Sequence, residues 1–193
     1  MRESAIHDGN SMVMSALPGD FPSSKAAARM IRVNQAGEYG AARIYEGQLA
    51  VLGNTPVASL LEHMRAQEQS HLDTFDRLIR ERRIRPTLLS PVWHVAGYAL
   101  GVLSACLGEK SAMACTVAIE EVIDEHYARQ SEDLEKHPDE IELREVIHRF
   151  REDERQHCEM GIEHGAADAP AFKLMKGVIK IASRTAIWLS TRL

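Results

Sequence analysis

The sequence predicts an all-α protein, built as a four-helix bundle with two accessory helices. The composition favours helix over sheet, because Ala, Leu, Ile, Glu and Arg dominate while aromatic residues make up only 5% of the chain. No run of strand length alternates between apolar and polar residues. Four segments instead repeat apolar residues at helical spacing, over about 25 to 29 residues each. Long helices of matched length pack as a bundle.

Serine and glycine residues mark several ends of six predicted helices. The first helix can be capped by Ser23 or Ser24, and Gly53 stops it. Gly108 and Gly165 close the third and fifth helices in the same way. The predicted helices cover residues 24–52, 56–83, 92–107, 111–136, 139–164 and 170–193. The third and sixth are the accessory helices, because they fall outside the set of four long ones.

The chain is expected to form a single domain over residues 23–193. Its length is enough for one sizeable core, and no linker-like or low-complexity run interrupts it. Residues 1–22 are expected to be a flexible N-terminus. They match neither a secretory signal nor an Arg-rich, acid-free transit peptide, and three cysteines without metal-type spacing indicate a reducing compartment. The net charge of −5 gives no reason to expect a nucleic-acid partner.

The motif that carries chemistry is Glu-x-x-His on a helix. Residues three apart share a helical face, so the carboxylate and the imidazole can reach one metal ion. Glu145 and His148 share their side of the helix with Arg149, which places that pair in solvent. The other two pairs lie on apolar stripes and face inward. The three matches in the chain are Glu68/His71, Glu145/His148 and Glu154/His157.

Each remaining long helix carries one inward-facing carboxylate, Glu38 on the first and Glu120 on the fourth. Glu121, beside Glu120, lies on a weaker apolar stripe. The chain is therefore a two-fold repeat of helix pairs, each pair supplying one Glu and one Glu-x-x-His. Four buried carboxylates are costly unless metal ions neutralise them. The predicted ligands of two iron ions are Glu38, Glu68, His71, Glu120, Glu154 and His157.

Oxygen and nitrogen ligands in this pattern are typical of ferritin-like di-iron and di-manganese proteins, and iron is expected here, with manganese or zinc as alternatives. A metal-bound histidine usually donates its second N–H to an acceptor. Asp153 is placed to accept from His71, and Gln67 from His157. His126 and Tyr127 also fall near the metals and are candidate second-sphere residues.

The two accessory helices suggest contact with a membrane. Residues 92–107 carry no formal charge, but as a helix they are too short to cross a bilayer core of about 30 Å. They form either a core helix or a face that enters one leaflet. Residues 170–193 form a basic amphipathic helix. Trp188 lies on its apolar face, and the basic face carries Lys173, Lys176, Lys180 and Arg184. The basic face is expected to meet anionic phospholipid.

Two stretches carry a family resemblance. They are Arg32-Val-Asn-Gln-Ala-Gly-Glu-Tyr-Gly-Ala-Ala-Arg-Ile-Tyr45 and Ala114-Cys-Thr-Val-Ala-Ile-Glu-Glu-Val-Ile-Asp-Glu-His-Tyr127. With the two inward Glu-x-x-His pairs, they resemble the demethoxyubiquinone hydroxylases of ubiquinone biosynthesis over residues 25–193. The resemblance implies ring hydroxylation of a polyprenyl methoxy-benzoquinone, with O2 and electrons from NADH. No glycine-rich dinucleotide fingerprint is present, so NADH would act in another way.

The resemblance also implies metal-ligand roles and a location. Glu68 and Glu154 would bridge the irons, with Glu38 and His71 on one iron and Glu120 and His157 on the other, although that pairing stays open. His126 and Tyr127 match positions tied to substrate or electron passage. The protein would lie on the cytoplasmic face of a bacterial inner membrane or, alternatively, on the matrix side of a mitochondrial inner membrane. Its partners would be membrane lipids, other ubiquinone-biosynthesis proteins and a second copy of itself.

Three other functions fit parts of the pattern. A ferritin-type ferroxidase would use the same six ligands but would not need the two accessory helices. A rubrerythrin-type peroxidase often carries a rubredoxin module with four cysteine ligands, and this chain has only three cysteines. A lipid-binding scaffold would have no use for four buried carboxylates.

Overall fold

The computed structural model describes residues 24–193 and is helical, as the sequence predicts. The bundle helices are α1 (Lys25–Leu52), α2 (Ala58–Glu81), α4 (Glu109–Leu134) and α5 (Ile141–Glu163). The accessory helices are α3 (Ser90–Cys106) and α6 (Phe172–Ser190), and a short 3-10 turn that the sequence does not predict, η1 (Ala166–Asp168), precedes α6. The expected flexible segment 1–22 lies outside the described residues, and the single domain over 23–193 stays a prediction.

The predicted helix ends are close to those observed. Ser24 caps α1, where its side chain accepts a hydrogen bond from the backbone N–H of Ala27. Gly53 is the C-cap of α1. Gly108 and Gly165 have positive φ angles of 102° and 83°, a conformation that glycine adopts at little steric cost. These glycines let the chain turn between successive helices.

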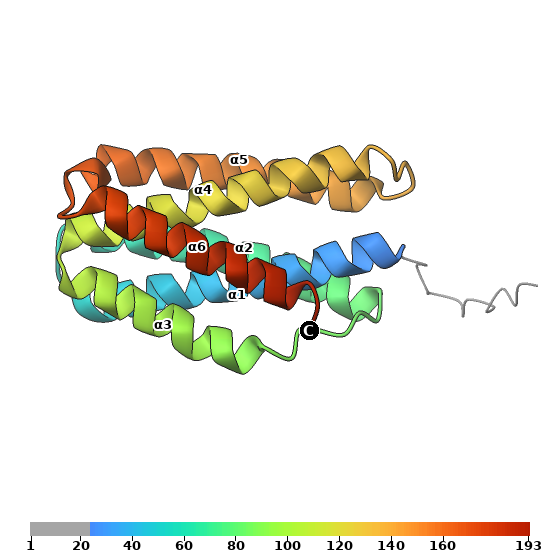
Figure 1. The fold of residues 1–193 in the computed structure, drawn as a ribbon, viewed down its shortest axis with the longest axis horizontal. Helices are drawn as coiled ribbons and strands as arrows, with labels where there is room; N and C mark the ends of the chain where they lie inside the picture. Colours follow the sequence, from blue (N-terminus) through green and yellow to red (C-terminus); the bar gives the residue numbers. More distant parts are fainter. Residues whose placement is uncertain (1–23) are drawn as a thin grey trace, which may run out of the picture.

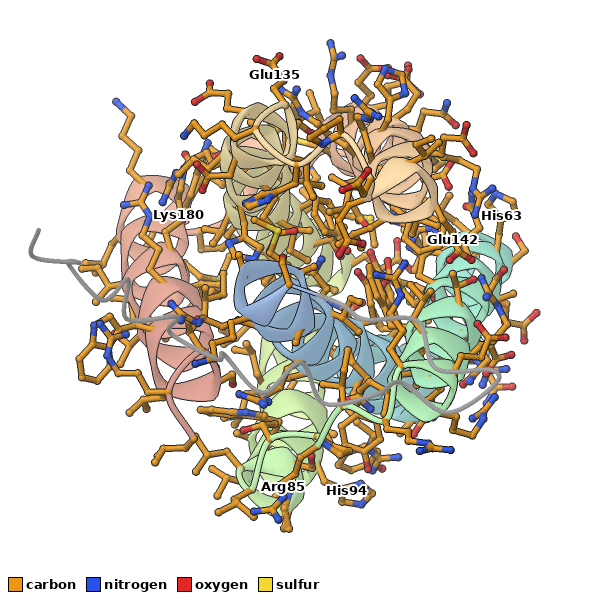
Figure 2. All side chains as sticks on the ribbon, turned by 90° about the vertical axis from the view of Figure 1, so that its right-hand side faces the viewer. His63, Arg85, His94, Glu135, Glu142 and Lys180 are labelled. Atoms are coloured by element: carbon orange, nitrogen blue, oxygen red, sulfur yellow. The ribbon has the colours of Figure 1, made fainter. Side chains whose placement is uncertain are left out.

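The six helices form two similar halves (Figure 1). In each half, the first bundle helix packs against the second and also against an accessory helix, so α1 contacts α2 and α3, while α4 contacts α5 and α6. The apolar core lies between the bundle helices and includes Phe75, Met64, Leu143 and Phe150. The end-on view shows α3 and α6 on the outside of the bundle, near the labelled His94 and Lys180 (Figure 2).

Glycine residues set the close approach of α3 to α1. A Cβ atom added to Gly101 would overlap the backbone carbonyl of Ile44, and one added to Gly97 would lie 2.8 Å from the carbonyl oxygen of Gly40. The two backbones therefore meet with almost no side chain between them. This close contact between backbones holds α3 against α1, and the spacing of apolar residues in the sequence does not predict it.

Three basic residues of α6 form ion pairs with acidic residues of α4, which the sequence does not predict. Lys176 Nζ lies 2.5 Å from a carboxylate oxygen of Glu121, Lys180 Nζ lies 3.0 Å from Glu121 and 3.1 Å from Glu125, and Arg184 lies 2.7 Å from Glu125. These contacts form an ion-pair ladder between α6 and α4. Lys173 on the same face is exposed, and Arg184 keeps 52% of its side-chain surface accessible, so contact of this face with phospholipid stays a prediction. Periodicity identifies the charged face but not the acidic helix opposite it.

The outer faces of both accessory helices are apolar and exposed. Val95 and Leu103 on α3, and Leu174 and Ile181 on α6, each keep 65–69% of their surface accessible. No helix in the described part of the chain is both long and apolar enough to span a bilayer. The three cysteines are free, and only Cys115 is buried, while Cys106 at the end of α3 is exposed.

Candidate metal centre

Six acidic and histidine side chains meet in the middle of the bundle. Each of the four bundle helices contributes at least one of them, and every one keeps at most 2% of its surface accessible. They are the predicted set, Glu38, Glu68, His71, Glu120, Glu154 and His157. Both Glu-x-x-His pairs contribute, because a step of three residues along a helix brings the two side chains to one face.

The six side chains form two overlapping groups. One group is Glu38, Glu68, His71 and Glu154, the other is Glu68, Glu120, Glu154 and His157, and the donor atoms within each group lie within 4.8 Å of one another. Glu68 and Glu154 belong to both. Each group thus has its own histidine, its own outer carboxylate and two shared carboxylates, a geometry suited to two metal ions side by side.

Both histidines turn the same nitrogen towards the carboxylates. His71 Nδ1 lies 3.3 Å from Glu154 and 3.5 Å from Glu38, and His157 Nδ1 lies 3.2 Å from Glu68 and 3.5 Å from Glu154. Their Nε2 atoms point away from the centre. This leaves Nδ1 as the nitrogen available to a metal ion and Nε2 as the site of the ring proton.

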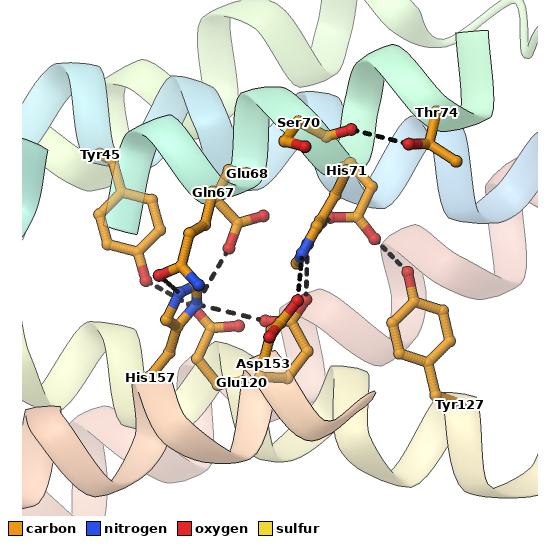
Figure 3. Close-up of polar contacts among 12 residues, drawn as sticks. Tyr45, Gln67, Glu68, Ser70, His71, Thr74, Glu120, Tyr127, Asp153 and His157 are labelled. Atoms are coloured by element: carbon orange, nitrogen blue, oxygen red, sulfur yellow. Dashed lines mark hydrogen bonds and ion pairs between the residues drawn. The ribbon is translucent and has the colours of Figure 1, made fainter. Parts of the chain in front are cut away.

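The outward nitrogens are held by the two residues that the sequence suggests. His71 Nε2 donates to Asp153 over 3.0 Å, and His157 Nε2 donates to Gln67 over 3.1 Å (Figure 3). Asp153 directly precedes Glu154, and Gln67 directly precedes Glu68. Each Glu-x-x-His helix therefore orients the histidine of the other half. Such contacts fix the tautomer and rotation of a ligating imidazole.

The centre has the polar atoms that a metal pair would satisfy. Within residues 24–193, both carboxylate oxygens of Glu68 and Glu154 are buried without a hydrogen-bond partner, as are one oxygen each of Glu38 and Glu120. Nδ1 of His71 and of His157 is unpartnered too. Buried polar atoms are rarely left in this way, and two divalent ions would balance the four negative charges. The carboxylate and imidazole donors suit iron.

Burial and mutual repulsion change the proton affinity of this cluster. Burial and the charge of Glu154 raise the pKa of Glu68 and of Glu120 well above their usual range. Burial opposes a charge on His71, but the nearby carboxylates of Glu154 and Glu38 outweigh it and raise its pKa to about 12. Without metal the cluster therefore holds protons at neutral pH. Binding of metal ions would release them.

Two buried tyrosines complete the centre and are related by the repeat. Tyr45 donates a 2.6 Å hydrogen bond to Glu120, and Tyr127 donates a short one to Glu38 (Figure 3). Each tyrosine follows the glutamate of its own helix by seven residues and reaches the glutamate of the other helix. The sequence predicts Tyr127 as a site residue. Tyr45 ends a stretch that carries the family resemblance but is not among the predicted site residues, although the same spacing from Glu38 could have identified it.

The remaining candidates lie apart from the carboxylates. Glu145 and His148 are both exposed, which confirms that this Glu-x-x-His pair lies in solvent. His126 does not contact the carboxylate cluster. Its Nε2 instead lies within hydrogen-bond distance of Gln130 Nε2, at 2.8 Å, and of Asn34 Oδ1, at 3.2 Å. The structure therefore brings Tyr127 into the centre and leaves His126 beside it.

An apolar cavity of about 190 Å³ leads from the accessory helices to the centre. Small and aliphatic residues of α1, α3, α4 and α6 form its walls. Polar groups are few, and Glu38, Tyr127, Asn34 and His126 are among them. The cavity thus joins one outer carboxylate of the centre to the space beneath α3 and α6. Its shape and lining suit an apolar molecule with one polar end.

The other outer carboxylate faces a different environment. Glu120 and Glu154 line a second cavity together with Asp124, Cys158 and other, mostly acidic, residues of α4 and α5. Burial raises the pKa of the Cys158 thiol to about 11, so this cysteine stays protonated at neutral pH. This side carries charged groups, in contrast to the apolar cavity at Glu38.

The chain matches known proteins over nearly its whole length. Residues 25–190 match the family model described as ubiquinone biosynthesis protein COQ7. A 3-demethoxyubiquinol 3-hydroxylase of Rhodospirillum rubrum is 50% identical over 192 residues, which cover 98% of this chain and 90% of the relative. Mitochondrial NADPH-dependent 3-demethoxyubiquinone 3-hydroxylases of Dictyostelium discoideum and Homo sapiens are 49% and 47% identical, each over 93% of this chain and 83% of the relative.

Proposed function

The chain belongs to the family of ubiquinone biosynthesis protein COQ7, and from this premise we propose that it is a di-iron monooxygenase. It hydroxylates the ring of a polyprenyl methoxy-benzoquinone, converting demethoxyubiquinone to demethylubiquinone at the penultimate step of ubiquinone biosynthesis, with O2 as co-substrate. The observation that carries the proposal is the junction of the six-residue centre with an apolar cavity at Glu38 and Tyr127. A ring placed there would lie beside the metal pair.

The grouping of the side chains supports a division of ligand roles. Glu68 and Glu154 would bridge the two irons, because they belong to both groups. Glu38 and His71 would complete one iron, and Glu120 and His157 the other. When bound, the iron pair supplies the redox chemistry that activates O2. Asp153 and Gln67 hold the histidine rings in place, and the apolar walls keep water away from the ring.

Tyr127 lies between the candidate metal centre and the cavity proposed to hold the substrate. Its hydroxyl donates to Glu38, while the residue also lines the cavity. It would hold the outer carboxylate in one orientation while the ring lies against its own side chain. Tyr45 would hold Glu120 in the same way on the side away from the cavity. His126 would act on the substrate and not on the metal pair.

The electrons would come from a nicotinamide nucleotide. NADH is the donor expected from the resemblance, whereas the names of the Dictyostelium and human relatives specify NADPH. Both nucleotides therefore belong in the assay. Passage of electrons through the quinone itself fits a chain whose sequence lacks a glycine-rich dinucleotide fingerprint.

Membrane association would use the exposed apolar faces of α3 and α6. Val95, Leu103, Leu174 and Ile181 lie on the two helices that also cover the cavity. A lipid-soluble substrate would pass between these helices without crossing water. The location would be the surface of an inner membrane, cytoplasmic in a bacterium or facing the matrix in a mitochondrion. A homo-oligomer and contacts with other ubiquinone-biosynthesis proteins stay predictions.

Turnover by the purified full-length chain tests this proposal. The protein is loaded with ferrous iron in detergent and given a short-chain demethoxyubiquinone, O2, and NADH or NADPH. A hydroxylated quinone that carries one oxygen atom from labelled O2 is the expected product. Oxidation and storage of ferrous iron without quinone turnover would replace the proposal with a ferroxidase, and peroxide consumption alone would replace it with a peroxidase.

A further inference from the structure

Two cavities reach the candidate metal centre, and their walls differ in polarity. The apolar cavity meets the centre at Glu38. The second cavity, of about 260 Å³, lies between α4 and α5 and meets the centre at Glu120 and Glu154. Six of its eight lining residues are Glu or Asp, and it is called the acidic cavity below.

The floor of the acidic cavity carries acceptor atoms without partners. Glu120 and Glu154 keep at most 1% of their surface accessible. Within residues 24–193, both oxygens of Glu154 and Oε2 of Glu120 have no hydrogen-bond partner. These two residues belong to the group of donors that also includes Glu68 and His157. Unpartnered carboxylate oxygens at the end of a cavity indicate a cation as the ligand.

Exposure rises from this floor to the surface. Glu121 and Asp124 in the walls keep 29% and 30% of their side-chain surface accessible. Arg155 and Glu159, which line the same cavity, are exposed and form its rim. The cavity therefore opens to solvent at that rim. It has room for several water molecules, so an ion could keep part of its hydration shell inside it.

Basic residues neutralise only part of the charge on these walls. The carboxylates of Glu121 and Glu125 are paired with bases of α6. Asp124 pairs through Oδ1 alone, with Arg151. Glu159 forms no ion pair with the described part of the chain. Asp124 Oδ2 and the Glu159 carboxylate are thus free to contact a passing cation.

The apolar cavity is a poor path for an ion. An ion that leaves water loses hydration energy, and only other polar ligands can replace it. Most walls of the apolar cavity are aliphatic, as at Ile44, Leu100 and Ile119. The acidic cavity instead presents oxygen atoms from rim to floor. The two cavities therefore suit two different kinds of ligand.

We propose that divalent metal ions enter and leave the centre through the acidic cavity, past Glu159 and Asp124. The inference rests on the metal pair of the proposed function and not on its substrate. Cys158 lies on this path, because it lines the cavity one helical turn beyond Glu154 and directly before Glu159. It belongs to neither group of metal donors. A change at Cys158 should therefore alter the rate of passage and not the final binding.

Replacing Cys158 with leucine narrows the path without changing a charge. The larger side chain extends into the cavity, so the ion must pass with fewer water molecules. We expect uptake and release of Fe²⁺ each to slow about tenfold, while Kd stays within about twofold of the parent and two irons still bind per chain. A group that is on the path but is not a ligand raises the barrier equally in both directions.

The rates are measured on the full-length chain under argon, where iron is not oxidised. Metal-free protein is mixed with Fe²⁺, and the remaining free Fe²⁺ is followed with a coloured chelator. Release is followed after transfer of loaded protein into excess chelator. Ala186→Leu is the matched control, because it fills the apolar cavity instead, and both of its rates should stay within about twofold of the parent.

A charge reversal at the rim gives a second measurement. Glu159→Lys should slow uptake about three- to tenfold at low salt, and less at high salt. Glu145→Lys makes the same change of charge on the opposite, exposed face of α5 and should leave the rate within about twofold. Equal slowing in the two variants would overturn the inference, because only the overall charge would then matter.

The narrowing variants can overturn the inference in three ways. Slower passage in Ala186→Leu but not in Cys158→Leu would place the path in the apolar cavity. Unchanged rates in both variants would show that ions enter elsewhere, and a large loss of affinity in Cys158→Leu would show an effect on the centre itself. Selective slowing without quinone turnover would leave the inference and remove the proposed hydroxylation. A parent protein that binds no iron at equilibrium would remove both.

Discussion

The two halves of the molecule build the same half of the candidate metal centre but give it different surroundings. Both supply an outer glutamate, a Glu-x-x-His pair, a residue that holds the opposite histidine, and a tyrosine that holds the opposite glutamate. Beyond that point the halves diverge. Glu38 and Tyr127 face an apolar cavity, whereas Glu120 faces a cavity with acidic walls. The shared parts supply the donor atoms suited to a metal pair, and under the proposed function the parts that differ determine where the substrate approaches.

The two tyrosines test this division with the largest expected effect. Tyr45→Phe and Tyr127→Phe each remove one hydrogen bond to an outer carboxylate, and each should weaken iron binding about 10- to 100-fold. Only Tyr127 also lines the cavity. We therefore expect only Tyr127→Phe to raise KM for the quinone. Chelator competition measures the iron affinity, and steady-state kinetics on iron-saturated protein measures KM.

An equal rise of KM in Tyr45→Phe would show that both sides of the centre meet the substrate. In that case the cavity at Glu38 would not be the one side from which the substrate approaches the centre. Matched circular dichroism spectra of the two variants would exclude misfolding as the cause of either change.

The two accessory helices differ at their glycines. Gly101 on α3 lies against the backbone of α1, whereas Gly177 on α6 has open space around it. Gly101→Ala would push a methyl group into the backbone carbonyl of Ile44, which cannot move without shifting α1. Overpacking of this kind should lower the free energy of unfolding by about 2–3 kcal/mol. Gly177→Ala on α6 is the control, because nothing lies within 4 Å of the added atom. It should raise stability by roughly 0.5–1 kcal/mol through helix propensity. Denaturant unfolding measures both, and equal effects would contradict the close approach of α3.

The stability contributed by the metal-free centre and by His126, beside the cavity, should depend on pH in opposite ways. In metal-free protein, the pKa of His71 is raised to about 12 from 6.5 in the unfolded chain, and the raised pKa of Glu68 acts in the same direction. The folded state then binds more protons than the unfolded state between pH 7 and 9. Its stability should fall as pH rises, by about 1.4 kcal/mol per pH unit for each extra proton.

His126 has the opposite sign. Its pKa is lowered to about 4, so the stability it contributes is complete above about pH 6.5 and is lost progressively as the pH falls from there through 4. It therefore contributes nothing to the slope between pH 7 and 9. Chemical denaturation at several pH values measures the slope. A metal-free protein whose stability rose from pH 7 to 9 would contradict the protonated centre, and metal loading should abolish the fall.

The ion-pair ladder beneath α6 should have the smallest effect. Glu125→Gln removes the partner of Lys180 and Arg184, but these side chains are partly exposed, so each pair contributes less than about 1 kcal/mol. The loss should shrink further in high salt. Glu132→Gln, on the exposed side of the same helix, is the control. A loss of several kcal/mol, insensitive to salt, would show that the ladder holds α6 more strongly than solvent screening allows.

The centre is predictable from the sequence because its chemistry follows helical spacing. The step of three residues from Glu68 to His71, with apolar neighbours at three and four positions, predicts that these side chains face the core, and the same pattern holds for the rest of the six. The same reasoning separates Glu154 from Glu145, nine residues earlier on the opposite face. Asp153 and Gln67 follow from their position directly before Glu154 and Glu68.

The features that sequence reasoning misses depend on contacts between segments far apart in the chain. It does not predict the ion pairs of the α6 lysines, because nothing local shows that Glu121 and Glu125 lie opposite them. It overlooks Asn34 because the partner, Gln130, is on another helix. Tyr45 has a local signal, its equivalence with Tyr127, but an apolar stripe explains it equally well. Periodicity predicts which face of a helix is buried, and not which residue it meets.

The most direct test of the two-metal centre is the iron content of two matched variants. Glu154→Gln changes a shared carboxylate of the buried pair, and Glu145→Gln makes the same change in the exposed Glu-x-x-His pair of the same helix. After loading with ferrous iron and removal of the excess, the parent and Glu145→Gln should each hold two irons per chain. Glu154→Gln should lose most of its iron. Full iron content in Glu154→Gln, or none in the parent, would contradict the account.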